Sequence, residues 1–451
     1  MKKLFGTDGI RGVAGEAPLD EFTLRRIGSA LVEEWKLQGT KPRVVLGRDT
    51  RASGEWITAT LVHSMMAAGI EGAADVGVIS TPGLAYLARH HGFDLGIMVS
   101  ASHNPYEDNG IKIFGKDGFK LTDVQELQIE QLVEELPPQP SAQDNSRSVE
   151  SGHLVQEYVG FLKNQTEISL DQLRIGLDVC NGSAHAIAPQ VFRELGATVV
   201  VINDEPDGKN INLNCGSLHL SKLVSLVKER GLDLGVAFDG DADRSLFVTP
   251  SGEVFDGDFV LFALALNFQG RRLLRANKVV GTIMSNYALE QTLSEHGIGF
   301  LRASVGDRYV LEMMKQSGAT LGGEPSGHVI LLESHTAGDG VLTAVKLAEI
   351  LSRNGATLDE LADGFHPYPQ VLDGLRVRRK IPLESPAIAS LIQDAERGFG
   401  EPGRLVIRYS GTEPLLRIMA EGRDGAKVRS VVSELKADLQ RLIAELSNGS
   451  A

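Results

Sequence analysis

The chain has little cysteine and no long hydrophobic run. Cys180 and Cys215 are the only cysteines among 451 residues, too few for a disulfide scaffold and not spaced as a metal-binding pair. No apolar stretch reaches the roughly 18 residues of a membrane span. Asp8 and Arg11 interrupt the N-terminus before an apolar signal segment could form. We therefore expect a cytoplasmic protein without a membrane-spanning segment.

The chain is also poor in positive charge. It has 45 Lys and Arg residues against 59 Asp and Glu residues, which gives a formal net charge of −14. Nucleic acids and anionic membranes are therefore not expected partners, and an anionic small molecule would need a locally basic pocket. With 23% charged and 42% hydrophobic residues, the composition is typical of a folded soluble protein. The length predicts roughly three domains or more.

Strand-length apolar runs alternate with helical patterns in three successive segments, which predicts three similar α/β domains with mixed sheets. The expected strands lie at 44–46, 76–79 and 95–99, at 174–179, 198–202 and 234–238, and at 279–284, 300–303 and 328–332. The rest has expected strands at 375–379, 404–407 and 416–420 and a long amphipathic helix at 427–446. This part is predicted to be a smaller C-terminal α+β domain.

Proline-rich and polar segments mark the expected domain limits. The stretch 135–150, the turn at 249–253 and the string His366-Pro-Tyr-Pro-Gln370 divide the chain into 1–150, 151–252, 253–367 and 368–451. The four motifs described next fall in these segments in order. We therefore expect four domains arranged around a central active-site cleft.

The first motif places a serine after a predicted strand. Residues 98–114 read Met-Val-Ser-Ala-Ser-His-Asn-Pro-Tyr-Glu-Asp-Asn-Gly-Ile-Lys-Ile-Phe, and we expect Ser102 to lie in a turn that also offers His103 and Lys112. A strand end fixes the hydroxyl while the turn leaves it exposed, so Ser102 is a candidate phosphate carrier. A plain turn is the alternative.

The second motif, Asp239-Gly-Asp241-Ala-Asp243-Arg244, presents three carboxylates at alternate positions after an apolar strand. Clustered carboxylates repel one another unless a hard cation lies among them, and oxygen ligands suit Mg²⁺. An EF-hand counted from Asp239 would need glycine and glutamate where Arg244 and Pro250 stand. A solvated acidic turn is the alternative. Arg244 indicates a phosphate nearby.

The third motif is the glycine-rich string Gly323-Glu-Pro-Ser-Gly-His328. Glu324 and Ser326 can hydrogen-bond to sugar hydroxyls, and His328 can transfer a proton. Glycine lets the backbone approach a ligand closely. A plain β-turn is the alternative.

The fourth motif lies near the C-terminus and suits a phosphate. Its hydroxyls, backbone N–H groups and two guanidinium groups come from Arg408, Ser410, Gly411, Thr412 and Arg417. No P-loop string accompanies it, so a nucleoside triphosphate is not the expected ligand. A hairpin corner with exposed arginines is the alternative.

Together these loops resemble the signature loops of the α-D-phosphohexomutases. The resemblance rests on Phe5-Gly-Thr-Asp-Gly-Ile-Arg-Gly12, Ser100-Ala-Ser-His-Asn-Pro105, Asp239-Gly-Asp-Ala-Asp-Arg244, Gly323-Glu-Pro-Ser-Gly-His328 and Arg408-Tyr-Ser-Gly-Thr-Glu-Pro414. Their order and spacing match over essentially the whole chain. The first string and Val305-Gly-Asp-Arg-Tyr-Val310 are most similar to the phosphoglucosamine mutases, which interconvert glucosamine 6-phosphate and glucosamine 1-phosphate for cell-wall amino-sugar synthesis.

One position departs from that family. Phosphoglucosamine mutases usually carry glutamine where Pro325 stands, and hexose enzymes of the superfamily often carry methionine. Proline fixes φ and lacks a backbone donor, so a stiffer loop is expected. The resemblance therefore implies the reaction class and leaves the sugar open between a glucosamine enzyme and a phosphomannomutase or phosphoglucomutase.

The resemblance implies a phosphoserine mechanism. Ser102 would pass its phosphoryl group to a hexosamine monophosphate, and the bisphosphate intermediate would turn over and return its other phosphate. Mg²⁺ would be bound by Asp239, Asp241, Asp243 and a phosphoserine oxygen of Ser102. Arg11 and Arg244 would act near the phosphoserine, Glu324 and Ser326 would bind the sugar, and Arg408, Ser410, Gly411, Thr412 and Arg417 would bind the non-reacting phosphate. Lys112, His103 and His328 are the candidate acids and bases, with Lys112 and His328 preferred.

Other classes of function remain alternatives at this point. A haloacid-dehalogenase-like phosphatase would use Asp239 as nucleophile and Asp241 as acid, but Asp243 stands where that motif has threonine or valine. A non-catalytic sugar-phosphate sensor would keep the scaffold, although all the chemical residues are present here. A homodimer through exposed faces of the first domain is a further expectation.

Overall fold

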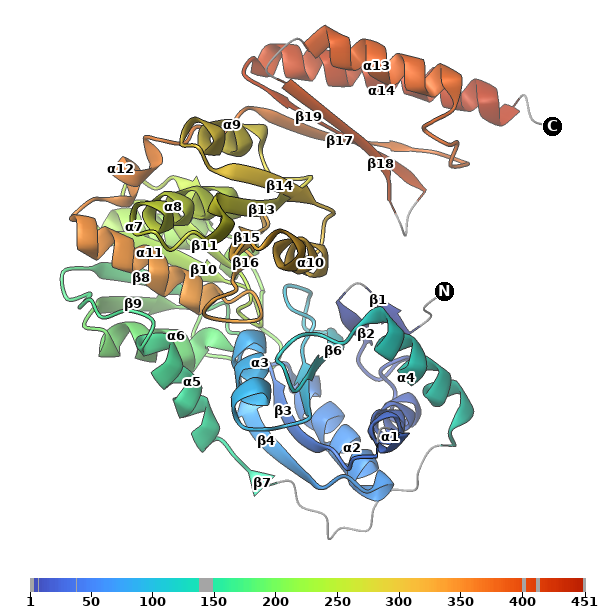
Figure 1. Cartoon of the computed structure of the whole chain (residues 1–451), viewed down its shortest axis with the longest axis vertical. Coiled ribbons are helices and arrows are strands. Elements are labelled where there is room, and N and C mark those ends of the chain that lie inside the picture. The colour runs from blue at the N-terminus through green and yellow to red at the C-terminus, as the bar shows by residue number, and fades with distance from the viewer. Residues whose placement is uncertain are drawn as a thin grey trace.

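The computed structural model describes residues 4–6, 8–37, 39–137, 149–399, 403–410 and 414–448. The strands form sheets with the orders β1-β2-β6-β5-β3-β4-β7, β12-β11-β10-β8-β9, β14-β13-β15-β16 and β17-β19-β18. The first three sheets mix parallel and antiparallel pairs, and the last is antiparallel. The predicted fold class is confirmed, as Figure 1 shows. Within these ranges, no helix has both the length and the apolar composition to cross a membrane.

The first sheet carries the serine loop between two neighbouring strands. Its strands are β1 (Phe5–Gly6), β2 (Gly9–Val13), β3 (Arg43–Arg48), β4 (Gly72–Val78), β5 (Leu95–Val99), β6 (Asp108–Gly115) and β7 (Val149–Glu150), and its helices are α1 (Glu21–Leu37), α2 (Ala52–Ala68), α3 (Thr81–His90) and α4 (Asp123–Glu135). Strand β5 is buried along its whole length and pairs antiparallel with β6. Residues 100–107 connect the two strands and include Ser102, and this segment is the serine loop.

The expected position of Lys112 in the turn is wrong, because this residue lies inside β6. Ile111 and Ile113 on either side of it are buried and continue the strand into the core. The chain therefore carries a lysine into the interior of the sheet, where its charge needs partners.

The second and third sheets each place one predicted loop between adjacent strands. The second unit contains α5 (His153–Lys163), β8 (Arg174–Asp178), α6 (Ala184–Glu194), β9 (Thr198–Ile202), η1 (Gly216–Leu218), α7 (Ser221–Arg230), β10 (Leu234–Phe238), β11 (Ser245–Val248) and β12 (Val254–Phe255); the third contains α8 (Gly257–Gly270), η2 (Arg275–Asn277), β13 (Lys278–Thr282), α9 (Tyr287–Glu295), β14 (Gly299–Ala303), α10 (Asp307–Ser317), β15 (Leu321–Gly323), β16 (Val329–Leu331), α11 (Gly340–Asn354) and α12 (Leu358–Ala362). The acidic loop joins β10 to β11, and the Glu324 loop joins β15 to β16. Strand β12 pairs with β11, so the second sheet extends beyond the expected limit at residue 252.

One hydrophobic core runs through the first three units. It contains Leu84 of the first unit, Leu177 of the second and Val345 of the third, all fully buried. Helix α5 packs against both α3 and α6, and α11 packs against α5, α6, β10 and β11. Because helices cross from one unit to the next, the three loops are fixed relative to one another.

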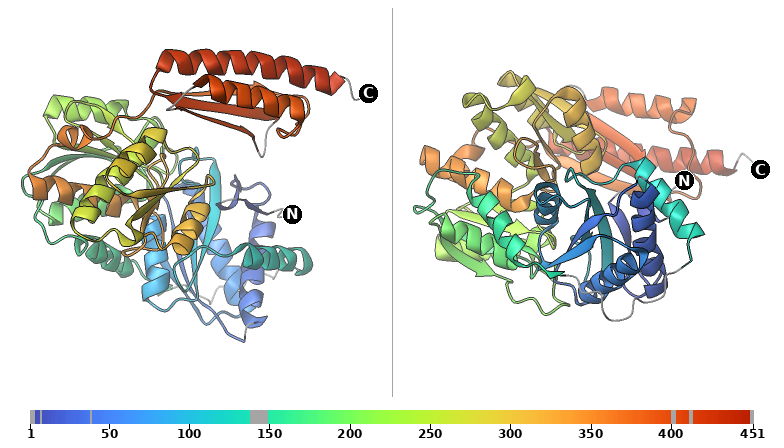
Figure 2. Two further views of the ribbon diagram at one scale, coloured as in Figure 1. Left: turned by 45° about the horizontal axis from the view of Figure 1, so that its top comes forward. Right: turned by 60° about the horizontal axis from the view of Figure 1, so that its bottom comes forward.

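The C-terminal unit is smaller and stands apart from the others in Figure 1. It contains β17 (Gln370–Arg376), α13 (Pro386–Phe399), β18 (Gly403–Tyr409), β19 (Leu415–Gly422) and α14 (Gly425–Asn448). Its helices cover one face of the sheet, and the other face is turned toward the rest of the molecule (Figure 2). Strand β17 begins before the expected residue 375, because its pairing with β19 starts at Gln370 opposite Glu421.

A buried hydrogen bond between α5 and α11 generates a stability prediction. Tyr158 Oη donates to Asp339 Oδ2 at 2.7 Å, and Asp339 also accepts from Leu342 N at the start of α11. Tyr158→Phe removes the hydroxyl that donates a hydrogen bond to the buried Asp339 carboxyl group. We expect the free energy of unfolding to fall by about 1–3 kcal/mol, measured by urea denaturation. Tyr86→Phe, in the same aromatic cluster but partly exposed, is the control, and equal losses in the two variants would contradict this reading.

Candidate active site

Ser102 adopts a backbone conformation that is uncommon outside glycine. Its φ is 54°, in the left-handed region, where a non-glycine residue carries about 1–3 kcal/mol of strain. In this conformation Ser102 Oγ donates to Asp239 Oδ2 at 2.6 Å and lies 3.4 Å from Nδ1 of His103. The expected exposure of the hydroxyl is wrong, because Ser102 is only 1% exposed. The hydroxyl is thus directed from the first unit at the acidic loop of the second.

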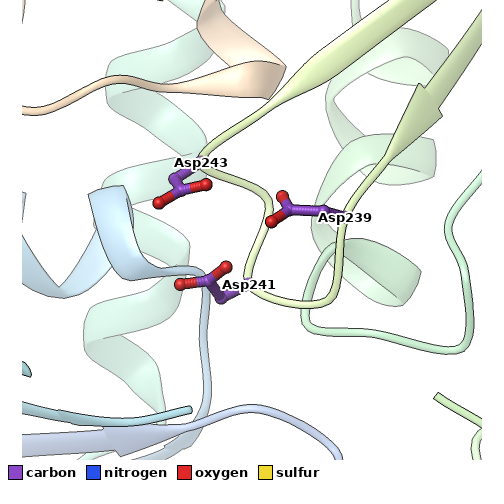
Figure 3. A group of neighbouring side chains, drawn as sticks. All are labelled: Asp239, Asp241 and Asp243. Atoms are coloured by element: carbon purple, nitrogen blue, oxygen red, sulfur yellow. The ribbon is translucent and has the colours of Figure 1, made fainter. Parts of the chain in front are cut away.

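The acidic loop brings three carboxylates together. Oxygens of Asp239, Asp241 and Asp243 lie within 4.8 Å of one another, and all three residues are buried. Figure 3 shows the side chains converging on one region. Burial and the two neighbouring carboxylates raise the pKa of Asp239 well above its usual value. Asp241 Oδ1 and Asp243 Oδ1 are buried without a hydrogen-bond partner, so the oxygen set fits a hard divalent cation.

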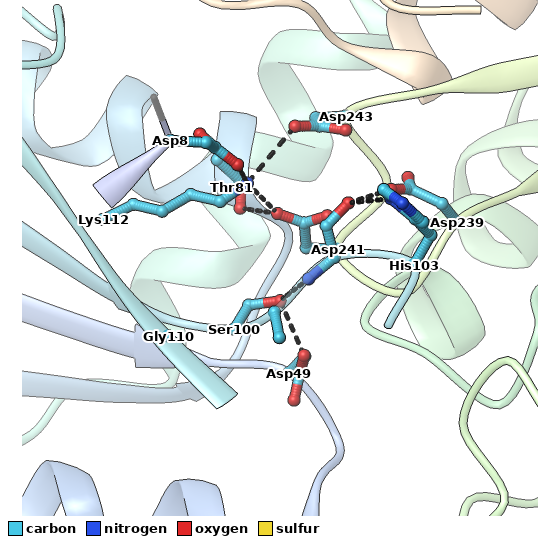
Figure 4. A network of polar contacts seen from close by, with 12 residues as sticks. Asp8, Asp49, Thr81, Ser100, His103, Gly110, Lys112, Asp239, Asp241 and Asp243 are labelled. Atoms are coloured by element: carbon cyan, nitrogen blue, oxygen red, sulfur yellow. Dashed lines mark hydrogen bonds and ion pairs between the residues drawn. The ribbon is translucent and has the colours of Figure 1, made fainter. Parts of the chain in front are cut away.

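Lys112 supplies the buried counter-charge. Its Nζ lies 2.7 Å from Asp241 Oδ2, 3.4 Å from Asp243 Oδ2 and 3.1 Å from Asp8 Oδ2, as Figure 4 shows. Although burial works against the charged form, Asp241 and Asp8 hold the pKa of Lys112 well above its usual value. The ammonium group therefore stays charged at neutral pH.

The charged groups continue into the third unit. Lys120 pairs with Asp8 and, at 2.6 Å, with Asp307 Oδ2. His328 lies 4.0 Å from Asp307 Oδ2 and 3.7 Å from Asp243 Oδ2. Although burial opposes it, Asp243 raises the pKa of His328. These contacts form a closed ring of Asp8, Lys120, Asp307, His328, Asp243 and Lys112, in which acidic and basic groups alternate.

Two predicted arginines lie beside Ser102. Arg11 Nη1 donates to Ala101 O at 3.0 Å, and Arg11 pairs with Asp8 at 2.5 Å. Arg244 Nη1 lies 3.3 Å from His103 Nδ1. Burial and the Arg244 charge lower the pKa of His103. Beside Ser102 this histidine is therefore favoured in its neutral form.

A cleft of about 1150 Å³ borders these groups. The predicted residues that line it are Arg11, His103, Asp243, Arg244, Glu324, His328 and Arg408. Ser102, Lys112, Asp239 and Asp241 are buried behind its wall. Residues from all four units therefore meet at one cleft.

The Glu324 loop is a turn with one polar group on the cleft. Glu324 O accepts from Gly327 N at 3.1 Å, and the Glu324 carboxylate accepts from Gly306 N at 2.9 Å. Pro325 O accepts from Gly257 N at 3.1 Å. The buried Ser326 Oγ has no hydrogen-bond partner, and Ser326 is not among the residues lining the cleft. The structure thus brings Glu324 to the site and leaves Ser326 beside it.

The C-terminal loop is described in part. Arg408 of β18 pairs across the sheet with Arg417 of β19, and Arg408 reaches the cleft. Ser410 N donates to Leu415 O at 2.8 Å. The structure does not place Ser410 or Arg417 among the residues lining the cleft. The predicted contacts of Gly411 and Thr412 lie outside the described residues.

The four units correspond to a known set of domains. The chain matches the phosphoglucomutase/phosphomannomutase alpha/beta/alpha domain I over residues 2–139, domain II over 156–252, domain III over 256–368 and the C-terminal domain over 374–437. The chain belongs to the phosphoglucomutase/phosphomannomutase family. The resemblance to the phosphohexomutases drawn from the loop motifs is therefore confirmed.

Relatives of this phosphohexomutase match it over nearly their whole length. It is 47% identical to the phosphoglucosamine mutase of Solibacter usitatus, over 98% of this chain and 100% of the relative. It is 45% identical to the phosphoglucosamine mutase of Koribacter versatilis, over 98% of each chain. A crystal structure of a phosphoglucomutase/phosphomannomutase family protein from Burkholderia thailandensis matches with a TM-score of 0.80 at 26% identity, over 97% of each chain.

Sequence reasoning missed several charged or polar groups of the phosphohexomutase site. Asp8 and Asp307 lie inside strings that carry the family resemblance, so a signal existed, but no role was assigned to them. Lys120 and Thr81 stand in no such string. The Thr81 hydroxyl, at the start of α3, donates to Asp241. Only the fold reveals these contacts.

The carboxylate cluster generates a metal-binding prediction. We expect the phosphohexomutase to bind Mn²⁺, a spectroscopic substitute for Mg²⁺, and Asp241→Asn to weaken this binding at least about tenfold, because it removes one anionic oxygen ligand. Electron paramagnetic resonance of free Mn²⁺ measures the affinity. Asp204→Asn, on an exposed loop, is the control. Equal Mn²⁺ affinity in the two variants would rule out a metal site at Asp241.

Proposed function

We propose that this phosphohexomutase interconverts glucosamine 6-phosphate and glucosamine 1-phosphate through a phosphoserine enzyme. The observation that carries the proposal is the 2.6 Å contact between Ser102 Oγ and Asp239, because it places a nucleophile beside three buried carboxylates. The relatives named phosphoglucosamine mutase support the choice of sugar. The enzyme would be an isomerase that serves amino-sugar nucleotide and peptidoglycan precursor synthesis.

Ser102 is the phosphoryl carrier of the proposed cycle. The bond between phosphorus and Ser102 Oγ breaks while a bond from phosphorus to a sugar hydroxyl oxygen forms, and the hydroxyl proton passes to a base. The second half of the cycle reverses these steps with the other phosphate of the bisphosphate. We assign proton exchange to His328 and His103, and the position of His328 on the cleft wall and of His103 beside Ser102 Oγ supports this assignment. Lys112, which the sequence favoured as an acid or base, is given a different role in this proposal: beside Asp241 and Asp8 its ammonium group stays charged, so it would stabilise negative charge.

We propose Mg²⁺ as the cation of the carboxylate cluster. Asp239, Asp241 and Asp243 would hold it together with a phosphoserine oxygen of Ser102. Bound there, Mg²⁺ would neutralise charge on the transferring phosphoryl group. Two phosphate dianions about 6 Å apart would repel by roughly 11 kcal/mol at an effective dielectric of about 20. Arg11 and Arg244 would add positive charge at the same place.

In the proposed mechanism, the other two loops bind the substrate. Glu324 and Ser326 would bind sugar hydroxyls, and the C-terminal loop would bind the non-reacting phosphate through Arg408, Ser410, Gly411, Thr412 and Arg417. The position of Arg408 on the cleft supports this assignment. Because either phosphate can occupy the same distal grip, the bisphosphate can present each end to Ser102 in turn.

Further parts of the proposal concern the whole protein. We propose four domains at 1–150, 151–252, 253–367 and 368–451, each carrying one loop of the site. The sheet orders support this division, apart from β12, which lies beyond residue 252 yet belongs to the second sheet. A cytoplasmic location and a homodimer through the first domain stay predictions.

The carrier role of Ser102 generates the decisive test. Ser102→Ala removes the nucleophile, so we expect mutase turnover to fall at least about 1000-fold and labelling by a phosphoryl-labelled hexosamine bisphosphate to disappear. Coupled assays and mass spectrometry measure the two effects. Ser169→Ala, at an exposed position between α5 and β8, is the control. Turnover that survives Ser102→Ala would favour phosphatase chemistry at Asp239 instead.

The departure at Pro325 generates a specificity prediction. We expect kcat/KM for glucosamine 1-phosphate to exceed that for glucose 1-phosphate and mannose 1-phosphate at least about tenfold, because Glu324 can bind the sugar's ammonium group as well as a hydroxyl. Steady-state rates with the three sugars measure this ratio, and Pro325→Gln tests whether proline alters it. Equal rates would make a phosphoglucomutase or phosphomannomutase the better assignment.

A further inference from the structure

Both backbone polar groups of Ser102 lead to one buried ion pair. Ser102 N donates to Ser100 Oγ at 2.9 Å, and Ser100 Oγ donates to Asp49 Oδ2 at 2.6 Å, as Figure 4 shows for Ser100 and Asp49. Ser102 O accepts from Arg51 Nη2 at 2.9 Å. Asp49 and Arg51 pair at 2.9 Å, and both side chains are 0% exposed. The peptide groups on either side of the strained residue are thus tied to the same pair of charges.

The guanidinium group of Arg51 forms most of its hydrogen bonds with the serine loop. Nε pairs with Asp49 Oδ2. The two terminal nitrogens donate to four carbonyl groups, those of Ser102, Asn104 and Pro105 in the loop and that of Asp108 at the start of β6. A planar fork with five N–H donors can reach these acceptors at once, whereas a lysine ammonium has three donors at a single point. The loop is therefore shaped around an arginine.

We propose that Arg51, acting with Asp49, is a positioning residue for phosphoryl transfer. It holds Ser102 in the left-handed conformation in which Oγ faces Asp239. Arg51 is not among the residues lining the cleft, so it acts through Ser102 and not on the substrate. This inference rests on the proposed function, because it assigns Arg51 a part in a step that Ser102 carries out.

The strain at Ser102 explains why such a device is needed. A non-glycine residue keeps a positive φ only where its surroundings fix it. From the second unit, Asn212 Nδ2 also donates to Ser102 O, at 2.9 Å, and a Cβ added at Gly240 would lie 2.4 Å from the same oxygen. These contacts limit where the peptide group can move. Arg51 supplies the hold from the first unit, and its loss frees the peptide group to rotate and carries Oγ away from Asp239.

The test separates the position of Ser102 from the amount of folded enzyme. Arg51→Lys keeps the positive charge beside Asp49 but cannot reach four carbonyl groups. We expect the single-turnover rate constant for phosphoryl transfer from glucosamine 1,6-bisphosphate to dephosphorylated full-length enzyme to fall on the order of 100-fold. The amplitude of that transfer and KM for the sugar monophosphate should stay unchanged. Rapid quenching followed by mass spectrometry measures both rate and amplitude.

Two further variants keep the test decisive. Arg48→Lys is the control. Arg48 is the last residue of β3, three positions before Arg51, and it pairs with Asp75 at 3.4 Å. This variant should leave the rate constant unchanged. Ser100→Ala cuts the link from Ser102 N to Asp49 without touching the buried arginine. It should also lower the rate constant, and it decides the question if Arg51→Lys does not fold.

The outcomes are distinguishable from failure of the proposed function. A normal rate constant in Arg51→Lys, or a loss confined to the amplitude, would overturn the positioning role while wild-type transfer stands. If Arg51→Lys does not fold, a normal rate constant in Ser100→Ala overturns the role in the same way. If the wild-type enzyme itself accepts no phosphoryl group at Ser102, the proposed function fails and the role of Arg51 fails with it.

Discussion

Electrostatic repulsion among Asp239, Asp241 and Asp243 is the constraint on which the site depends. Their oxygens lie within 4.8 Å of one another. At an effective dielectric of about 20, each pair of unit charges at that separation repels by about 3–4 kcal/mol. Lys112, which is only 1% exposed, offsets part of this repulsion. Asp241 Oδ1 and Asp243 Oδ1 have no hydrogen-bond partner. A divalent cation bound to these oxygens would offset the remaining repulsion.

The charged groups that pair in the site come from three domains, and these ion pairs help to hold the domains together. Lys112 and Lys120 belong to the first unit, Asp243 to the second, and Asp307 and His328 to the third. A displacement of any one unit would leave buried charges without partners, at a cost of several kcal/mol. The common hydrophobic core prevents such displacements, since α5 and α11 pack across the unit boundaries. The core and the ring of charges therefore stabilise the same arrangement.

The sequence predicts what is local and misses what the fold brings together. The carboxylates of the acidic loop, Ser102 and His328 could be found because strand ends and glycine-rich turns keep such residues close along the chain. The position of Lys112 was wrong, because a lysine looks like a turn residue until Ile111 and Ile113 are seen to continue a strand. Lys120 and Asp307 are 187 positions apart, so no local pattern joins them. The same reason hides the role of Arg51, because the carbonyl groups that it contacts lie 51 to 57 residues further along the chain.

The C-terminal domain differs from the others in how it is held. Within the residues that the structure describes, none of its strands pairs with a strand of another sheet. It reaches the third unit through side chains, for example from Arg404 Nη2 to Ser285 O at 2.9 Å. In the proposed cycle, the bisphosphate must turn end over end without leaving. The first three domains keep Ser102 and the carboxylates in fixed positions, because a shift of one of these domains would separate its charged groups from their partners. In that cycle the fourth domain, which contacts the third unit through side chains, would open and close on the distal phosphate, so that rotation of the intermediate would not disturb the reacting groups.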